Sequence, residues 1–156
     1  MEWEGNQRDG GDRRALIVTV HALEAIGRHV SQWLPFESGG ILIGDRVDDT
    51  FYGDEFVPLE GALPSTHRYL ARAVHATRAI LRADREGRRV VATVHSHPDG
   101  NGEPSHTDLQ NAYGYREVLH IVVNFRQGAP ACRVYKYHRT EEGYCAQPVP
   151  LDIAAP

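Results

Sequence analysis

Residues 90–108 read VVATVHSHPDGNGEPSHTD, and this stretch decides how the middle of the chain is interpreted. It begins with a continuous apolar run, which is typical of a strand buried on both faces. The run ends in the polar residues His95 and His97. Residues 98–104 are rich in Pro, Gly and Asn, which predicts a loop, and a helix is expected to begin at Ser105. Polar side chains at the end of a buried strand, beside such a loop, indicate a functional site.

Metal binding is the first chemistry that this stretch suggests. His95 and His97 are two residues apart on a strand, so their side chains lie on the same face and can bind one ion. Asp108 falls in the first turn of the expected helix, which the loop can bring back over the strand end. Two histidines and one carboxylate leave a tetrahedral zinc ion with one position open to water, as in catalytic zinc sites.

Each part of this pattern also has an ordinary alternative. A pair of histidines on a strand can be joined by a hydrogen bond with no metal present. Ser105 to Asp108 matches the S-x-x-D capping box of a helix. Glu37, the best candidate for a base beside an open metal position, precedes two glycines at the entry to a buried strand. Its alternative is a solvated loop glutamate. Gly39 and Gly40 lack side chains and would leave room for an extended chain to approach beside Glu37. Their alternative role is a tight turn into the strand at Ile41.

Taken together, the motifs resemble the signature of the JAMM, or MPN-plus, metalloprotease family. They are PFESGGILIG around Glu37 and HSHPDGNGEPSHTD from His95 to Asp108. The resemblance covers roughly residues 15–137, and the joint motif is far more specific than its parts. It implies that His95, His97 and Asp108 bind Zn²⁺. It also implies that Glu37 is the general base and acid and that Ser105 stabilises the oxyanion.

The resemblance further implies a fold and an activity. The fold is a single α/β MPN domain, similar to that of cytidine deaminases, with a curved mixed sheet flanked by helices. The activity is zinc-dependent hydrolysis of a peptide or isopeptide bond. The chain resembles the compact prokaryotic members, because 156 residues leave little room for insertions that grip ubiquitin chains. The expected substrate is therefore a ubiquitin-like or sulfur-carrier protein, cut after its C-terminal Gly-Gly.

The rival hypothesis is a non-catalytic MPN module that binds protein partners and keeps zinc for structure. Glu37 and Ser105, which a structural zinc ion does not need, favour the enzyme.

Apolar periodicity gives the expected order β-α-β-β-α-β-α-β-β. The domain is expected to span residues 15–150, between a mobile N-terminal arm over 1–14 and a C-terminal tail over 151–156. Strands are expected over 16–20, 41–47, 51–59, 90–97, 119–125 and 131–137, and helices over 23–33, 66–86 and from 105 onward. Gly87 is expected to end the second helix.

Composition excludes several classes of protein. With 17 basic and 21 acidic residues the formal charge is -4, so the chain offers no broad basic surface for nucleic acid. No apolar run approaches the roughly 20 residues that span a bilayer, so no membrane partner and a cytoplasmic location are expected. Cys132 and Cys145 form no CxxC motif and are interpreted as reduced thiols, with a disulfide between them as the alternative. The sequence leaves the oligomeric state open.

Overall fold

The computed structural model describes residues 2–3, 15–110 and 118–154. Its centre is a nine-stranded mixed sheet with the order β1-β7-β6-β5-β3-β4-β2-β9, and β8 pairs with β7 off this path. The strands are β1 (Glu2–Trp3), β2 (Ala15–Thr19), β3 (Gly39–Val47), β4 (Thr50–Leu59), β5 (Arg89–His97), β6 (Leu119–Arg126), β7 (Ala129–Thr140), β8 (Gly143–Val149) and β9 (Leu151–Ala154). The helices are α1 (Val20–Gln32), α2 (Ala73–Arg85) and α3 (His106–Gln110). None of the helices in the described ranges is long and apolar enough to cross a membrane.

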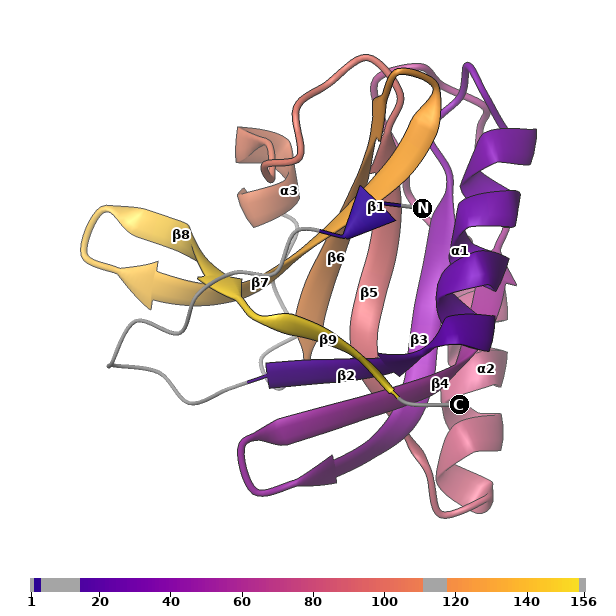
Figure 1. Ribbon diagram of the computed structural model, residues 1–156, viewed down its shortest axis with the longest axis vertical. Helices are drawn as coiled ribbons and strands as arrows, with labels where there is room; N and C mark the ends of the chain where they lie inside the picture. Colours follow the sequence, from indigo (N-terminus) through magenta and orange to yellow (C-terminus); the bar gives the residue numbers. More distant parts are fainter. Residues whose placement is uncertain (1, 4–14, 111–117, 155–156) are drawn as a thin grey trace.

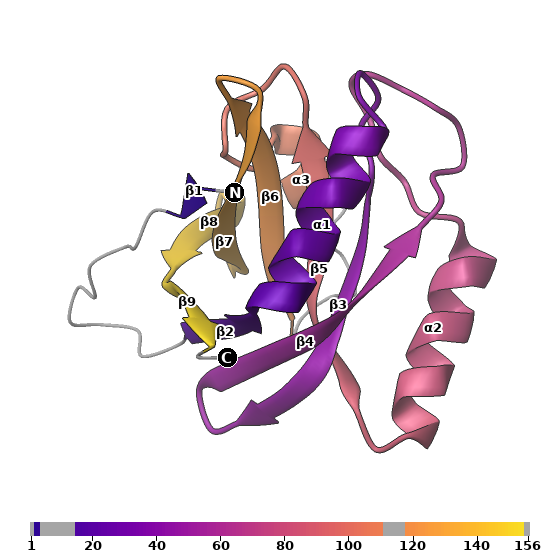
Figure 2. The same ribbon diagram turned by 45° about the vertical axis from the view of Figure 1, so that its right-hand side comes forward.

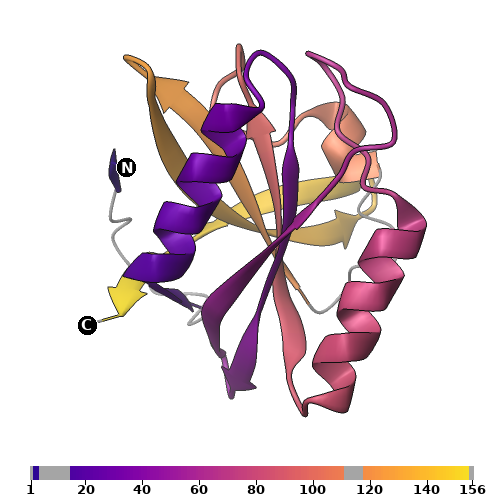
Figure 3. The ribbon, with the colours of Figure 1, turned by 90° about the vertical axis from the view of Figure 1, so that its right-hand side faces the viewer.

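The two long helices pack on opposite faces of the sheet, as Figures 1 and 3 show. Successive residues of β3 demonstrate this, because side chains alternate along a strand. Leu42 belongs to a core cluster with Leu23, Ile26 and Val30 of α1. Ile41 and Ile43 instead join a second cluster with Ala79 and Ala83 of α2. The predicted single α/β domain, with a curved mixed sheet flanked by helices, is confirmed.

The N-cap residue Thr19 sets the start of helix α1. The Thr19 side chain accepts a hydrogen bond from the Ala22 amide at 3.2 Å, which satisfies one of the free N–H groups of the first turn. The apolar spacing alone places the start near residue 23, so the prediction missed the first turn. The helix ends at Gln32, before the Leu34-Pro35 bond, as expected from the restriction that proline places on its predecessor.

Helix α2 is shorter than predicted, because residues 66–72 belong to a loop. Ser65 Oγ accepts hydrogen bonds from the amides of His67 and Arg68, both at 3.2 Å, and this turn competes with a helix. An isolated antiparallel bridge between Gly61 and Ala71 closes the loop over residues 60–72. The other end of α2 follows the prediction, since Gly87 has a φ of 70° just after the last turn.

The C-terminal residues contradict the predicted tail over 151–156. Leu151–Ala154 form β9, which pairs in parallel with β2, and Leu151 is buried. Pro148 and Pro150 interrupt the apolar alternation there, so the sequence pattern predicted neither β8 nor β9. At the other end, Glu2–Trp3 pair with β7 as β1, while the remainder of the predicted arm over 1–14 lies outside the described residues.

Both cysteines are free, as interpreted from the sequence. Burial in β7 raises the pKa of the Cys132 thiol to about 12, which keeps it protonated and unreactive. Cys145 lies on β8 with its Sγ 2.7 Å from His138 Nε2 on the neighbouring strand.

Candidate metal centre

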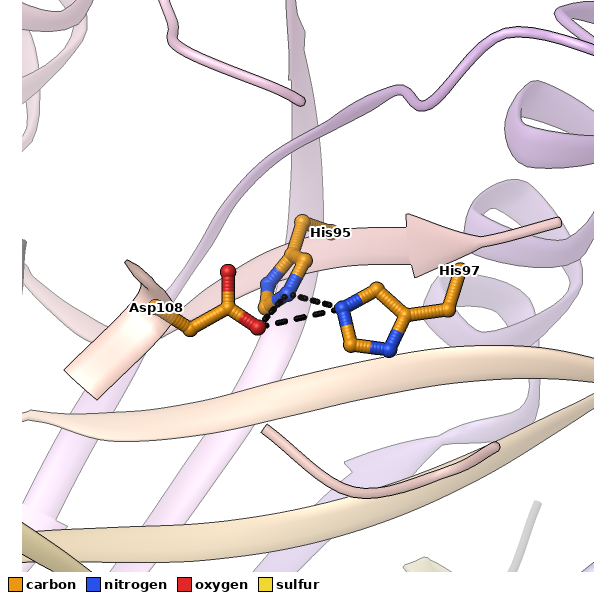
Figure 4. A group of neighbouring side chains, drawn as sticks. All are labelled: His95, His97 and Asp108. Carbon is orange, nitrogen blue, oxygen red and sulfur yellow. Dashed lines mark hydrogen bonds and ion pairs between the residues drawn. The ribbon is translucent and has the colours of Figure 1, made fainter. Parts of the chain in front are cut away.

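Two histidines and one aspartate converge where β5 ends, as Figure 4 shows. His95 and His97 share a face of β5, and Asp108 comes from the first turn of α3. His95 Nε2 and His97 Nε2 are 3.0 Å apart, and they lie 3.0 and 3.1 Å from the same Asp108 oxygen, Oδ2. The three side chains are largely buried. The residues predicted to be ligands are therefore brought together.

The capping box and the ligand cluster use the same aspartate. The Ser105 amide donates to Asp108 Oδ2 at 2.7 Å, and the Asp108 amide donates to Ser105 Oγ at 3.0 Å. These reciprocal bonds are the predicted helix cap. The cap also fixes the Asp108 side chain with Oδ2 toward the two histidines. The two interpretations of this segment are thus compatible.

The donor set suits a divalent cation. Atoms bound at 2.0–2.1 Å to a tetrahedral zinc ion lie about 3.3 Å apart, close to the separations of the three donor atoms here. His97 Nδ1 lies 3.1 Å from the Asn101 carbonyl oxygen, which accepts a hydrogen bond from the protonated Nδ1. This second bond leaves the lone pair on Nε2, the atom that faces the cluster. The three residues could therefore hold one metal ion.

The charge of Asp108 matches this role. Burial alone raises the pKa of its carboxyl group, but hydrogen bonds with His95 and His97 outweigh burial and hold the pKa well below its usual range. Asp108 is therefore ionised at neutral pH, as a metal ligand must be.

Glu37 lies beside the cluster on the loop between α1 and β3. Burial raises the pKa of the Glu37 carboxyl group, and the charges of His95 and His97 partly oppose that rise. The Ser96 amide, between the two candidate ligands, donates to the Ser38 carbonyl oxygen at 2.8 Å, which sets the neighbouring Glu37 beside the end of β5. The backbone is held from the neighbouring loop, since the Glu37 amide donates to the Ser65 carbonyl oxygen at 2.7 Å. The structure thus brings Glu37, predicted from its place in the sequence, to the metal centre.

Sequence reasoning missed the residues that hold Glu37 in place. Ser96, between the two histidines, points to the opposite face of β5 and is fully buried. Its Oγ accepts a hydrogen bond from the Ser38 amide at 2.9 Å, and its own amide donates to the Ser38 carbonyl oxygen at 2.8 Å. Strand periodicity alone could have shown that Ser96 faces away from the histidines, toward the interior.

Gly39 is required by the approach of β3 to β5. A Cβ atom at this position would lie 1.9 Å from the Val94 carbonyl oxygen and 2.9 Å from His95 Cα. Gly40 is similarly confined, since its Cβ would lie 2.1 Å from the Val57 carbonyl oxygen on β4. The two glycines therefore serve close packing of three strands, a reason that differs from the tight turn considered for them.

We expect Gly39→Ala to lower the free energy of unfolding by about 1–3 kcal/mol, because β3 must move away from β5. The same movement would displace Glu37 and reduce turnover. Urea unfolding measures the first effect. The matched control is Gly61→Ala, whose Cβ would meet no atom closer than 3.6 Å. Equal stability of the two variants would contradict the steric argument.

A groove leads away from the metal centre along the face of the sheet that α2 covers. Its volume is about 680 Å³. His95 and Asp108 line one end, and Thr93, His120 and Tyr137 add polar groups beside them. The rest of the lining is mostly apolar and includes Ile41, Leu59, Leu70, Ala76 and Ile80. An extended segment of another chain can therefore reach the ligands along a mostly apolar surface.

Comparison with known proteins gives the family. Residues 19–135 match the family described as prokaryotic homologs of the JAB domain. This chain belongs to that family. The matched region contains Glu37, Ser105 and the three candidate ligands, and the resemblance to JAMM, or MPN-plus, proteins found from the motifs is confirmed.

Three known proteins illustrate what this chain is similar to. A Thermus thermophilus protein named "Probable TtuB-protein conjugate cleaving protease" is 32% identical over 98 residues, which are 62% of this chain and 63% of that relative. The alignment thus spans less than two thirds of the relative's length. The solution structure of DSY2949 from Desulfitobacterium hafniense has a TM-score of 0.74 at 21% identity, covering 89% of this chain and 94% of that one. A Salinibacter ruber protein has a TM-score of 0.63 at 26% identity, with 89% and 90% covered.

Proposed function

We propose that this JAB-domain protein is a zinc-dependent metallopeptidase of the JAMM type. Its substrate is a ubiquitin-like or sulfur-carrier protein, cut at the peptide or isopeptide bond after a C-terminal Gly-Gly. The observation that carries the proposal is the convergence of His95, His97 and Asp108 beside Glu37, on a groove that admits an extended chain. The family and the protease name of the Thermus relative support a peptidase. The name of that relative also supports the proposed substrate class.

His95, His97 and Asp108 would hold the ion in this scheme, through the three atoms that face one another. A bound zinc ion supplies Lewis acidity, which polarises the scissile carbonyl group and lowers the pKa of a coordinated water molecule. The hydrogen bond from His97 Nδ1 to the Asn101 carbonyl oxygen keeps that ring oriented. The cap at Ser105 does the same for Asp108.

Glu37 moves the proton. Its carboxylate accepts a proton from the attacking water and delivers it to the leaving amine as the C–N bond breaks. Burial favours the protonated form of the Glu37 carboxyl group, so its pKa is raised toward the range in which one group can both accept and release a proton. The hydrogen bond from the Glu37 amide to the Ser65 carbonyl oxygen holds the backbone of Glu37 in position between the two steps.

Ser105 has room for a second role beside its cap. Its Oγ accepts a hydrogen bond from the Asp108 amide through a lone pair, which leaves the hydroxyl proton available for donation. In the proposed reaction this proton is donated to the oxyanion of the tetrahedral intermediate.

The two roles of Ser105 predict two separate losses. We expect Ser105→Ala to lower the free energy of unfolding by about 1 kcal/mol and turnover by about 10²-fold. The matched control is Thr19→Ala, which removes the cap of α1 and should lower stability alone. Unfolding curves and steady-state kinetics distinguish the two effects. Wild-type turnover in Ser105→Ala would leave Ser105 with only its cap.

The substrate class can be tested with TtuB of Thermus thermophilus as the probe. TtuB is extended at its C-terminus by Gly-Gly and a short reporter peptide, incubated with the zinc-loaded protein, and the products are identified by mass. We expect release of the reporter after the second Gly. A second fusion with Ala-Ala in place of Gly-Gly is the control, since side chains there would obstruct a narrow approach to the ligands.

The outcome also distinguishes the rival hypothesis. Cleavage only of unrelated peptides would contradict the substrate class. Tight binding of the fusion with no cleavage at any zinc concentration would instead support the non-catalytic binding module.

A further inference from the structure

We infer that the folded body of the substrate protein docks on an apolar rim beside the metal centre, through an apolar patch bordered by acidic side chains. The rim consists of Trp33, Leu34, Phe36 and Leu63. This inference rests on the proposed function, because the substrate tail in the active site determines where the body must lie.

The rim exposes large apolar side chains in two adjoining loops. The exposed fractions are 37% for Trp33, 42% for Leu34, 37% for Phe36 and 80% for Leu63. Single exposed apolar residues are common on protein surfaces, but several that gather around a site indicate an interaction surface. Trp and Phe are also enriched at protein interfaces, and Trp is among the residue types that contribute most to binding there.

The position of the rim links it to catalysis. Phe36 directly precedes Glu37, and the loop that carries Leu63 is joined to Glu37 by the hydrogen bond from the Glu37 amide to the Ser65 carbonyl oxygen, at 2.7 Å. Figures 1 and 2 show the loop after α1 and the loop after β4 at the end of the molecule where β5 ends. A substrate tail of six extended residues spans at most about 20 Å. The body of a substrate cut at the metal centre is therefore held near this end.

The part of the rim that follows α1 is held in shape before any partner binds. The ring of His29 lies 6.3 Å from the ring of Trp33 and 5.6 Å from that of Phe56 on β4. The Phe36 amide donates to the Trp33 carbonyl oxygen at 2.8 Å. A surface fixed in this way loses little conformational entropy on binding, which favours its use as a docking site.

The charges around the rim select the partner. Residues 31–36, SQWLPF, carry no charge. The loop over residues 60–72 carries Glu60, Arg68 and Arg72, and Glu60 forms an ion pair with Arg72 at 3.9 Å. Arg68 and the neighbouring His67 are exposed on the same loop as Leu63, so a complementary surface is apolar with carboxylates at its border. A substrate body with a basic border would be repelled by Arg68.

The test compares a whole substrate with its tail. One substrate is TtuB extended by Gly-Gly and a reporter peptide, and the other is a peptide of its last ten or so residues with the same reporter. We expect Leu34→Ser and Leu63→Ser to lower kcat/KM for the TtuB fusion by about tenfold, mainly by raising KM. The kcat/KM of both variants for the tail peptide should stay within about twofold of the wild-type value. Arg68→Glu should also lower kcat/KM for the TtuB fusion and leave kcat/KM for the tail peptide unchanged.

The matched control is Val47→Ser. Val47 is 60% exposed at the far end of β3 from Glu37, so its loss should alter neither substrate. If the rim variants slow both substrates equally, or slow neither, the docking inference is wrong. A change in the molecular mass of the protein in solution on Leu63→Ser would overturn it too, because the rim would then join two copies of this chain.

The inference and the proposed function fail in different ways. If wild type cuts the fusion and the peptide equally well, the rim contributes nothing and only the docking inference fails. If wild type cuts neither, the proposed function fails. Docking on the rim is then tested by comparing the affinity of wild type and of the rim variants for the fusion. Weaker binding to Leu34→Ser and Leu63→Ser would then support docking, and unchanged or absent binding would contradict it.

Discussion

Glu37→Gln is expected to abolish most turnover, by about 10²-fold or more, while the fold and the metal content stay unchanged. The amide has the size and shape of the carboxylate but cannot accept the proton of the attacking water. Backbone bonds that the substitution does not touch hold the residue, through the carbonyl oxygen of Ser65 and the Ser38–Ser96 pair. The loss would therefore report proton transfer and not displacement of the loop.

Three measurements make this prediction decisive. Elemental analysis should give the same zinc content as wild type, and thermal unfolding the same midpoint. Kinetics with the TtuB fusion should show the loss in kcat. Glu24→Gln, on the exposed face of α1, is the control and should retain wild-type turnover. Undiminished cleavage by Glu37→Gln would remove Glu37 from the mechanism.

The ligand cluster could be predicted from the sequence because its parts obey local rules. A period of two places His95 and His97 on one face of a strand, and a capping pattern places Asp108 in the first turn of the next helix. Neither rule says where that turn lies relative to the strand. The loop over 98–104 decides this, and Tyr135, distant in sequence, fixes it by donating a hydrogen bond to the Gly102 carbonyl oxygen at 2.6 Å.

The contacts that position Glu37 could not be predicted for the same reason. Ser38 and Ser96 are 58 residues apart, and their pairing depends on β3 lying beside β5 in the register that sets Gly39 opposite His95. A single sequence contains the two serines but not that register. The catalytic role of Glu37 was inferred from its motif, whereas its placement comes from tertiary structure.

The fold shows where local signals fail. Residues 66–72 have helical spacing, yet the side chain of Ser65 turns the backbone and the bridge between Gly61 and Ala71 closes a loop. Strand β9 is short and follows Pro150, so it has little local preference, and its pairing with β2 supplies the hydrogen bonds that define it. A local turn at Ser65 outweighed the helical spacing in the first place, and pairing between distant segments defined the strand in the second.

Asp108→Asn is the second change with a large expected effect, and it separates the two roles that one oxygen performs. The amide oxygen of Asn can still accept from the Ser105 amide, so the start of α3 should persist. A neutral amide is a weak zinc ligand, so the zinc content should fall from about one per chain toward zero. Turnover should fall by about 10³-fold or more, since both the ion and its Lewis acidity are lost.

Two further variants separate metal binding from helix capping. Asp108→Ala should lose the zinc and also about 1 kcal/mol of stability in the metal-free protein, because no acceptor is left for the Ser105 amide. His97→Ala should lose the zinc while the cap stays intact. The comparison is made by elemental analysis and by unfolding of each protein after chelation, which removes the contribution of the metal to stability. Full zinc content in either Asp108→Asn or His97→Ala would show that the ligand set is wrong. A metal-free stability of Asp108→Asn as low as that of Asp108→Ala would show that the cap needs the charge of the carboxylate.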